Sequence, residues 1–550
     1  MRTHVVTNVV PAPTGLNVLR CDAALSEAVD RWVTPADPTG GAALDDLGAL
    51  AGTPEVRQWA DQADRVTPVL RTHAPTGERV DEVEFHPAYH RLMRVAVGNG
   101  LTAEPWTRPA DAGAHARRAA GFVVWSQVEA GHLCPVSMTY AAAPALAAEP
   151  DVAARWMPGL ASRSYDPVLS PMADKAGLTV GMGMTEKQGG SDVRANTTSA
   201  VAAPGGPLHG DTYRLTGHKW FCSAPMSDAF LVLARTEAGL GSFLLPRVLD
   251  DGSRNDIRLQ RLKDKLGNRA NASSEIELDG AWAVRVGEEG RGIRTILDMV
   301  ASTRLDCVLG SAATMRAALV RAVHHARHRS AFGALLVDQP LMRNVLADLS
   351  LESEAATVLA MRLAHAVDAG EQDLSRLGVA LGKFWVCKRT APMVAEALEC
   401  LGGNGYVEEN GLARLYREAP LNSIWEGSGN VSALDVVRAL TREPASLAAL
   451  GKELALSRGH DRILDAAIDE CESASALALG PDAPWSARRL VERLALTLQA
   501  ALLVRHAPGP VADAFVASRL GGDHGVTFGT IGSSVGPEAV SLLLERALRA

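Results

Sequence analysis

The sequence has few cysteines, few aromatic residues and no long apolar run. Its seven cysteines are scattered over 550 residues without a C-x-x-C pair, which argues against a disulfide framework and suits a reducing compartment. No apolar run approaches the ~20 residues that span a bilayer. Asn8, Pro11 and Pro13 interrupt the start of the chain before a signal peptide could form. We therefore expect a cytoplasmic protein without a membrane partner.

The chain also lacks a strong excess of either charge. A formal net charge of −8 gives no long-range attraction for polyanions, which weakens any function that needs the whole surface to bind nucleic acid. Hydrophobic residues at 47% and charged residues at 21% are typical of a folded globular protein. A chain of this length exceeds what one hydrophobic core usually supports, so several packed units are expected.

Two kinds of hydrophobic pattern, helical and strand-like, alternate along the chain. Helical spacing dominates from about 24 to 180 and returns after about 290, where a stripe with three- and four-residue spacing predicts one buried side of a long helix (Leu305, Val308, Ala312, Met315, Leu319 and Ala322). Between 181 and 285, short alternating runs are separated by Gly, Asp and Asn clusters, at 213–216, 230–233, 242–245 and 275–278. Such runs predict a small antiparallel sheet or barrel.

Several metal- and nucleotide-binding signals are weak or missing. His86 and His90 have the spacing of a zinc helix, but Pro87 stands where the general-base Glu would be, so we predict no metal site. His324, His325 and His328 lie among arginines, and we expect them on a solvated or phosphate-facing surface. No G-x-G-x-x-G follows a strand, so no Rossmann domain is indicated.

The segment 184–192 (MTEKQGGSD) combines two glycines, which allow close approach of a ligand, with hydroxyls that can meet polar ring edges or phosphate oxygens. By itself it is only a loop. Five further stretches follow in order, at 217–223 (GHKWFCS), 263–292, 329–333 (RSAFG), 401–406 (LGGNGY) and 424–430 (IWEGSGN). Together the six resemble the ordered signature stretches of the acyl-CoA dehydrogenase family, and six ordered matches support one another.

Within that family, the sequence resembles the AidB branch, flavoproteins linked to the bacterial response to DNA alkylation. The resemblance rests on residues 185–192, 339–343 and 423–430 and on the extra C-terminal residues. The resemblance implies a mainly helical α+β fold of the acyl-CoA dehydrogenase type. We predict an N-terminal helical domain at 1–180, a β-barrel domain at 181–285, a four-helix-bundle domain at 286–440 and an additional C-terminal helical domain at 441–550.

The resemblance also implies FAD as cofactor. The isoalloxazine ring would contact Met182, Met184, Thr185, Gly189, Gly190, Ser191, Phe221, Cys222 and Ser223. The adenine and pyrophosphate end, bound in a neighbouring subunit, would contact Arg329, Phe332, Gln339, Gly402, Gly403 and Asn404. Further cofactor contacts are Ile424, Trp425, Gly427, Ser428, Gly429 and Asn430. Shared cofactor sites imply a homo-oligomer, in this family a tetramer.

Glu426 matches the position of the family's catalytic base, which removes the α-proton of an acyl thioester. The alternative base position of some members is occupied by Thr303, which carries no carboxylate, and Arg304 is expected to contact the substrate. Desolvation beside the flavin would raise the pKa of Glu426 toward the working pH. We expect dehydrogenation of a short or branched acyl-CoA, because Trp425 is bulkier than the family's Tyr and would shorten the acyl pocket.

Two departures from the family pattern affect the pyrophosphate end. Gln339 is one residue closer to Arg329 than usual, and Glu399 replaces a Gln, so a carboxylate would stand near a pyrophosphate and repel it. Either Glu399 turns away, or this end of the cofactor is held differently.

Two other functions remain open at this point. The AidB resemblance allows a DNA-associated flavoprotein that protects against alkylation damage. Its C-terminal residues 441–550, however, carry 11 Lys plus Arg and 13 Asp plus Glu, which is not the footprint of a DNA-binding unit. Four arginines could still form a basic stripe on a helix pair (Arg488, Arg489, Arg493 and Arg505). A nitroalkane oxidase would use Asp where this chain has Glu426, which counts against it.

Overall fold

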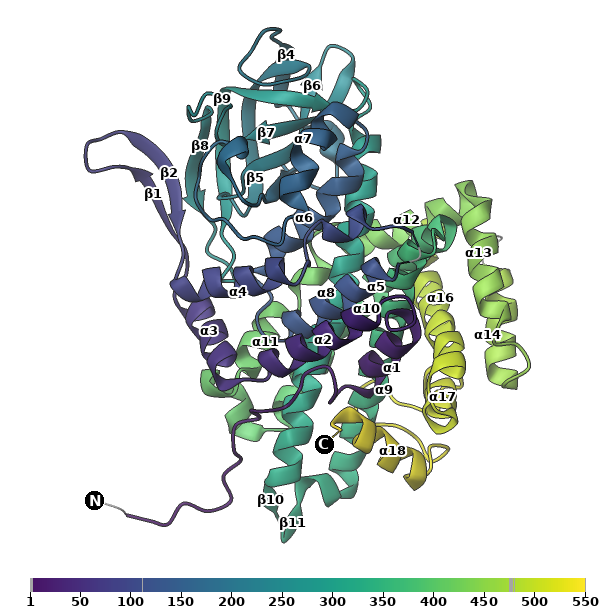
Figure 1. Cartoon of the computed structure of the whole chain (residues 1–550). Coiled ribbons are helices and arrows are strands. Elements are labelled where there is room, and N and C mark those ends of the chain that lie inside the picture. Colours follow the sequence, from purple (N-terminus) through teal and green to yellow (C-terminus); the bar gives the residue numbers. More distant parts are fainter. Residues whose placement is uncertain (1–2, 111, 474–477, 479, 550) are drawn as a thin grey trace. The chain divides into compact units, whose positions relative to one another are not determined.

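The computed structural model describes residues 3–110, 112–473, 478 and 480–549 (Figure 1). The chain divides into two compact units. Unit 1 contains Met1–Pro54, Ala110–Gln127 and Cys307–Ala550, and unit 2 contains Glu55–Pro109 and Val128–Asp306. The division at residue 306 falls inside the long helix α8 (Gly292–His328). These units cut across the four ranges expected from the sequence.

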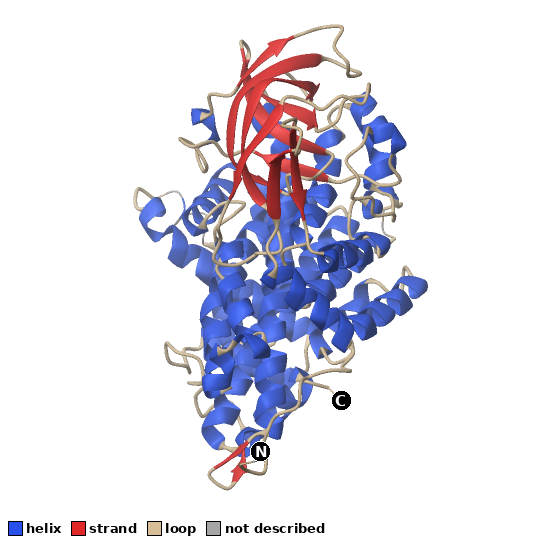
Figure 2. Ribbon diagram, turned by 90° about the vertical axis from the view of Figure 1, so that its left-hand side faces the viewer, coloured by secondary structure: helices blue, strands red, loops and turns tan. Residues whose placement is uncertain are grey.

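A closed ring of strands forms the centre of unit 2 (Figure 2, red). β4 (Ser199–Ala202), β5 (Thr212–Ser223), β9 (Ser273–Val286), β7 (Gly239–Pro246) and β6 (Ala229–Thr236) pair in that order, and β6 returns to β4 to close a small barrel. β3 (Val180–Gly183) runs parallel to β6, and β8 (Ile257–Leu262) pairs with β9. The four runs predicted as strands lie in β5, β6, β7 and β9, which confirms them.

The barrel is held together by the alternating apolar side chains of these strands. Leu215, Phe230, Val232, Phe243 and Ile276 are among the residues buried in its core. Because successive side chains of a strand point to opposite faces, each long strand contributes every second residue to this core. The remaining positions of β5 and β9 are free to carry polar groups toward other surfaces.

Unit 2 also contains helices and one further hairpin. The helices are α3 (Pro54–Arg65, whose first residue belongs to unit 1), α4 (Pro87–Gly98), α6 (Leu133–Leu146) and α7 (Pro150–Leu160). β1 (Val69–His73) and β2 (Arg79–Glu84) form an antiparallel ribbon in a region that the sequence pattern predicted to be helical. Arg79 donates to Leu259 O at 2.9 Å and Arg247 donates to Asp81 O at 2.8 Å, so long-range hydrogen bonds attach the ribbon to the barrel.

Unit 1 is helical. It contains α1 (Ala23–Trp32), α2 (Pro38–Ala51), α5 (Ala114–Ser126), the second part of α8, α9 (Pro340–Asp368), α10 (Gln372–Glu399), α11 (Leu412–Glu418) and α12 (Gly429–Arg442), with a two-residue hairpin of β10 (Ser330–Ala331) and β11 (Ala334–Leu335). α10 packs against α9 and α12, and α5 packs against α9. The Asp368 carboxylate accepts from the backbone N–H groups of His115 and Ala116, which caps the start of α5. All six stripe positions of α8 are buried, as predicted.

The last helices pack into unit 1. They are α13 (Pro444–Ala455), α14 (Arg462–Glu472), α16 (Ala483–His506), α17 (Gly509–Phe515) and α18 (Pro537–Ala547). α16 packs against α9, α10 and α12, and α18 packs against α9. Buried Arg546 of α18 hydrogen-bonds the carboxylates of Glu354 in α9 and Glu27 in α1. Among the residues that the structure describes, no helix is both long enough and apolar enough to cross a lipid bilayer.

Candidate active site

A buried ion pair holds the loop that follows β3 in unit 2. Lys219 of β5 donates to Glu186 at 2.8 Å, and neither side chain is exposed. Glu186 also accepts from Thr197 N at 2.7 Å, while Lys219 donates to Leu233 O at 2.6 Å. Burial alone would raise the pKa of Glu186, but Lys219 and the other donors outweigh it and hold this pKa at about 2. The loop is therefore tied to the barrel through Glu186.

The same loop has a tight backbone. Glu186 N donates to Gly189 O at 2.9 Å, and Asn196 Nδ2 donates to Met184 O at 2.8 Å. A Cβ at Gly189 would lie 2.6 Å from Asp192 O, so only glycine fits there. A Cβ at Gly190 would make only ordinary van der Waals contacts, with Thr185, so packing does not require glycine at this position. Of the predicted residues, Met182 is buried, Met184 and Thr185 are half-buried, and Ser191 is exposed.

The end of β5 presents three consecutive predicted residues in alternating directions. Phe221 is 50% exposed, which is unusual for a large aromatic side chain, while Cys222 is fully buried in the barrel core. Burial raises the pKa of the Cys222 thiol to about 12. Ser223 is half-buried, with its hydroxyl 3.2 Å from that of Ser273. Phe221 and Ser223 can therefore face a cofactor with their side chains, whereas Cys222 can do so only with its backbone.

Glu426 lies in unit 1, between η7 (Leu421–Ser423) and the start of α12. Its φ is 58°, in the left-handed region that non-glycine residues rarely adopt, and Gly427 follows with φ 104°. A backbone held in this region is a strained feature that clusters at active sites. The Glu426 side chain is half-buried, whereas Ile424 is 63% exposed.

Lys383 of α10 braces this loop. Its side chain is buried, and its Nζ donates to Asn422 O at 2.6 Å and to Gly427 O at 2.9 Å. The Trp425 indole N–H donates to Asn422 Oδ1 at 2.8 Å, which fixes the indole beside the loop. One ammonium thus holds the backbone on both sides of Glu426. No sequence motif pointed to Lys383, because it lies 39 residues from Asn422 in sequence.

The predicted residues at the adenine end are also in unit 1. Arg329 is followed by a turn in which the Phe332 side chain is fully exposed. The backbone φ is 53° at Phe332 and 84° at Gly333. Gln339 Nε2 donates to Ala331 O at 2.8 Å, so this residue braces the turn despite its unusual spacing. Gly402, Gly403 and Asn404 lie exposed in η5 (Gly402–Tyr406), and a Cβ at either glycine would meet nothing. The Glu399 side chain is exposed.

Other candidates take ordinary structural places. His86 caps α4 by accepting from Ala88 N, and His90 hydrogen-bonds the Tyr165 hydroxyl. His325 is buried, so the expectation that all three histidines of its cluster lie on a solvated surface is wrong for this residue. Arg304 lies half-buried in α8, on the unit 2 side of the division, and Thr303 is buried beside it.

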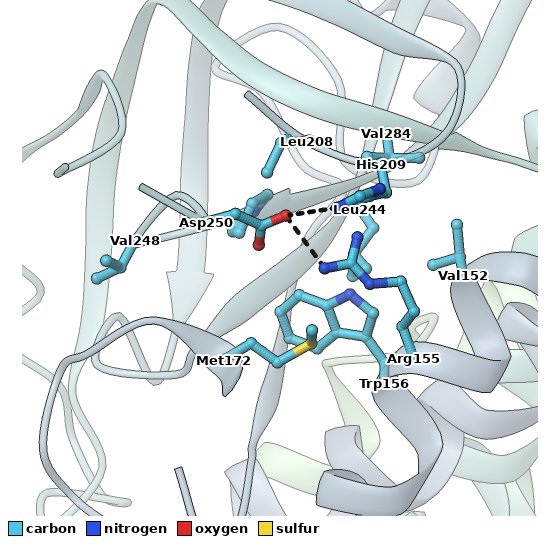
Figure 3. A pocket seen from close by; sticks show the side chains of 11 residues that line it. Val152, Arg155, Trp156, Met172, Leu208, His209, Leu244, Val248, Asp250 and Val284 are labelled. Carbon is cyan, nitrogen blue, oxygen red and sulfur yellow. Dashed lines mark hydrogen bonds and ion pairs between the residues drawn. The ribbon is translucent and has the colours of Figure 1, made fainter. Parts of the chain in front are cut away.

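One pocket in unit 2 is lined by none of the predicted site residues (Figure 3). It is an open hollow whose volume, counted together with the solvent space at its mouth, is about 390 Å³, and Trp156 and Met172 are among the apolar side chains that line it. Asp250 pairs there with Arg155 at 3.1 Å and with His209 at 3.8 Å. Because none of the predicted cofactor or substrate residues lines it, this pocket is separate from the candidate active site.

Comparisons with known proteins identify the family to which the sequence belongs. The family models for the AidB N-terminal domain, the acyl-CoA dehydrogenase middle domain and the acyl-CoA dehydrogenase C-terminal domain match residues 8–167, 181–281 and 290–441. The putative acyl-CoA dehydrogenase AidB of Escherichia coli is 45% identical over 94% of both chains. The chain belongs to the acyl-CoA dehydrogenase family. It is an oxidoreductase of the AidB-like type.

Two animal comparisons extend this assignment. Acyl-CoA dehydrogenase family member 11 of Caenorhabditis elegans is 32% identical over 78% of this chain and 71% of its own length. The crystal structure of Caenorhabditis elegans ACDH-11 in complex with C11-CoA has a TM-score of 0.83 and 28% identity, and covers 99% of this chain and 93% of that chain. The acyl-CoA dehydrogenase fold predicted from the sequence is therefore confirmed.

The four arginines considered for DNA all lie on the single helix α16, not on a helix pair. Arg493 pairs with Glu470 at 2.7 Å, and Arg505 pairs with Glu453 at 2.9 Å. Arg488 lies over the Phe384 ring, 5.8 Å from its centroid. Because two of the four charges are neutralised within unit 1, the structure does not favour α16 as a phosphate-binding stripe in this acyl-CoA dehydrogenase relative.

Proposed function

We propose that this chain is an FAD-dependent acyl-CoA dehydrogenase in which Glu426 is the base that removes the α-proton. The observation that carries the proposal is the Glu426 loop. Its left-handed backbone is held on both sides by one buried ammonium, that of Lys383. A structural Glu that only caps a turn needs no such brace, whereas a base needs its carboxylate at a fixed position.

The residues of unit 2 fit a flavin ring. A half-exposed Phe221 offers a planar apolar surface, Ser223 offers a hydroxyl that can donate to a ring nitrogen or oxygen, and the exposed Gly190 allows close backbone approach. In unit 1, the Arg329 fork and the open backbone at Gly402 and Gly403 suit a pyrophosphate. Bound FAD would accept the β-hydrogen of the substrate as a hydride.

The protein's own residues supply the other half of the reaction. The Glu426 carboxylate takes the α-proton, and the backbone N–H of the same residue hydrogen-bonds the thioester carbonyl, which stabilises the charge that develops there. Thr303 of α8 carries no carboxylate that could replace Glu426.

Trp425 sets the proposed substrate class. Its indole is fixed by Asn422 next to the base, which leaves less room for an acyl chain than a smaller ring would. We therefore propose short or branched acyl-CoA thioesters as substrates. The related ACDH-11 structure contains C11-CoA, so a medium-chain thioester is the natural competitor in a substrate test.

The exposed Phe332 and the Arg329 turn support an oligomer, because in the proposed arrangement they bind the adenine end of FAD held mainly by a neighbouring copy. We propose a homotetramer. Size-exclusion chromatography with light scattering measures this directly, and a monomeric protein with full flavin content would contradict the shared site.

Anaerobic flavin bleaching tests the proposed reaction. The purified protein, mixed with acyl-CoA thioesters from short branched chains up to C11 without an electron acceptor, should lose the visible absorbance of its oxidised flavin. Glu426→Gln should slow bleaching by about 10²–10⁴-fold, the usual value of a general base. Exposed Glu538→Gln on α18 is the matched control and should bleach normally. No bleaching with any thioester would refute the proposal.

A further inference from the structure

The stretch before α1 is attached to the Arg329 turn within unit 1. Asn8 Nδ2 donates to Ser330 O at 2.8 Å, and Ser330 N donates to Asn8 Oδ1 at 2.8 Å. The Arg329 guanidinium in turn donates to Asn8 O. Three hydrogen bonds therefore join residues that are more than 320 positions apart in sequence.

The chemistry of Asn8 suits this contact. Its φ is 57°, in the left-handed region that asparagine tolerates better than most residues. The side-chain amide carries both a donor and an acceptor, so it pairs with the backbone of one residue as a neighbouring strand would. A second attachment lies close by, where His324 Nε2 is 2.8 Å from Pro11 O. The segment from Asn8 to Pro11 thus follows the end of α8.

The turn depends on such support. β10 and β11 have two residues each, and a hairpin of this size has little stability by itself. Asn8 holds its first strand at Ser330, and Gln339 holds Ala331 from the other side. Of the guanidinium N–H groups of Arg329, only Nη1 has an acceptor within the described residues. Its Nε and Nη2 groups keep a fixed direction and can donate to a ligand.

We propose that Asn8 is a positioning residue for the phosphate-bearing end of the cofactor. It fixes the turn through Ser330 and orients the Arg329 guanidinium. A guanidinium donates two parallel hydrogen bonds to a phosphate only when it is correctly oriented. The inference rests on the proposed FAD binding. It assigns a role in cofactor retention to the stretch before the first helix, which none of the signature motifs includes.

A double-mutant cycle on the full-length protein tests this role. FAD release on dilution, followed by flavin fluorescence, gives Kd for the wild type, Asn8→Ala, Arg329→Gln and the double variant. Asn8→Ala should raise Kd about tenfold, the value of losing two hydrogen bonds. In the double variant, Asn8→Ala should add nothing to the effect of Arg329→Gln, because Asn8 acts through Arg329. Fully additive effects would overturn the proposal.

Three further measurements separate positioning from general stability. Asn8→Gly keeps the left-handed backbone without the amide and should match Asn8→Ala. His4→Ala, in the same segment but hydrogen-bonded to its neighbour Thr3, should leave Kd unchanged. FMN, which lacks the adenylate, should bind the flavin-free full chain with a Kd that Asn8→Ala changes less than about twofold. Equal losses for FAD and FMN would show a merely structural role. A wild type that binds no FAD would instead refute the proposed function itself.

Discussion

Glu186 and Lys219 show how single residues fix the proposed flavin loop. A buried pair is costly to desolvate, and its partners are held by further hydrogen bonds to Thr197 N and Leu233 O. Removing one partner leaves the other charged and buried. Removing both leaves an apolar site of similar volume. The pair is therefore best understood as a device that fixes geometry, and its effect on stability depends on pH.

We predict an acid-dependent loss of stability from this pair. The Glu186 pKa is lowered from 4.5 to about 2 in the folded chain. A group with a lowered pKa stabilises the fold fully above its unfolded value, and this contribution disappears as the pH falls toward about 2. Between about pH 6.5 and about pH 4, urea unfolding of the wild type should lose roughly 1 kcal/mol more than that of Glu186→Gln/Lys219→Met.

The single variant Glu186→Gln serves as the reference for the double change. It leaves the Lys219 ammonium buried without its carboxylate and should cost about 3–5 kcal/mol at neutral pH. The double variant should be more stable than this single variant. If both variants and the wild type lost stability in parallel with falling pH, the Glu186 pKa would be the same in the folded and the unfolded chain, and the prediction would be wrong.

At the scale of elements, α10 determines where the proposed base lies. Lys383 reaches from the middle of this helix to both ends of the Glu426 loop, so the position of the helix determines that of the carboxylate proposed as the base. A loop without this brace would sample other backbone conformations, because the left-handed φ of Glu426 is unfavourable for a residue with a Cβ.

We predict that Lys383→Met slows flavin bleaching by acyl-CoA about 10–100-fold while FAD remains bound. A displacement of the base by about 1 Å is enough for such a loss. Stopped-flow absorbance measures the rate, and the flavin spectrum reports occupancy. Lys452→Met is the matched control, because Lys452 is exposed on α13 and belongs to none of the predicted site stretches. An unchanged rate in Lys383→Met would show that the brace is not needed for catalysis.

The elements that the sequence predicted correctly are those with local signals. Apolar residues recur every three or four positions in the α8 stripe and at every second position in the barrel strands. The need to bury these residues on one side is enough to favour a helix in the first case and strands in the second. The β1–β2 ribbon was missed because its burial pattern is mostly exposed and its attachments come from distant residues, among them Arg247. Its stability is not encoded in its own periodicity.

The candidate site was predictable to the same extent. Glu426 and the Arg329 turn belong to contiguous motifs, so the sequence alone singles them out as candidates. Lys383 and Asn8 contact the same two loops from far along the chain, and neither stands in a motif. Which backbone carbonyl a distant side chain meets depends on the packing of whole helices. Such supporting residues become visible only in the structure.

At the scale of the whole molecule, buried charge pairs join the C-terminal helices of unit 1 to α9 and α1. Arg546 in α18 bonds Glu354 in α9 and Glu27 in α1. Arg362 in α9 bonds Glu453 in α13, and Arg519 contacts Asp348 in α9. Because each of these pairs joins a C-terminal segment to a helix earlier in the chain, the C-terminal helices and the bundle depend on one another.

We therefore predict that the C-terminal helices unfold together with the bundle. Hydrogen exchange of the full-length protein with increasing urea should protect α9 and α16 to the same free energy, since both belong to one cooperative unit. Arg546→Met should lower that shared value by about 3–5 kcal/mol, because it leaves Glu354 buried, where burial already raises the pKa of its carboxyl. Arg549→Met removes a partly exposed pair with Glu27 and should cost less than about 1 kcal/mol. If α16 exchanged at much lower urea than α9, the last helices would be an independent domain added to the bundle, and the buried pairs would not couple them.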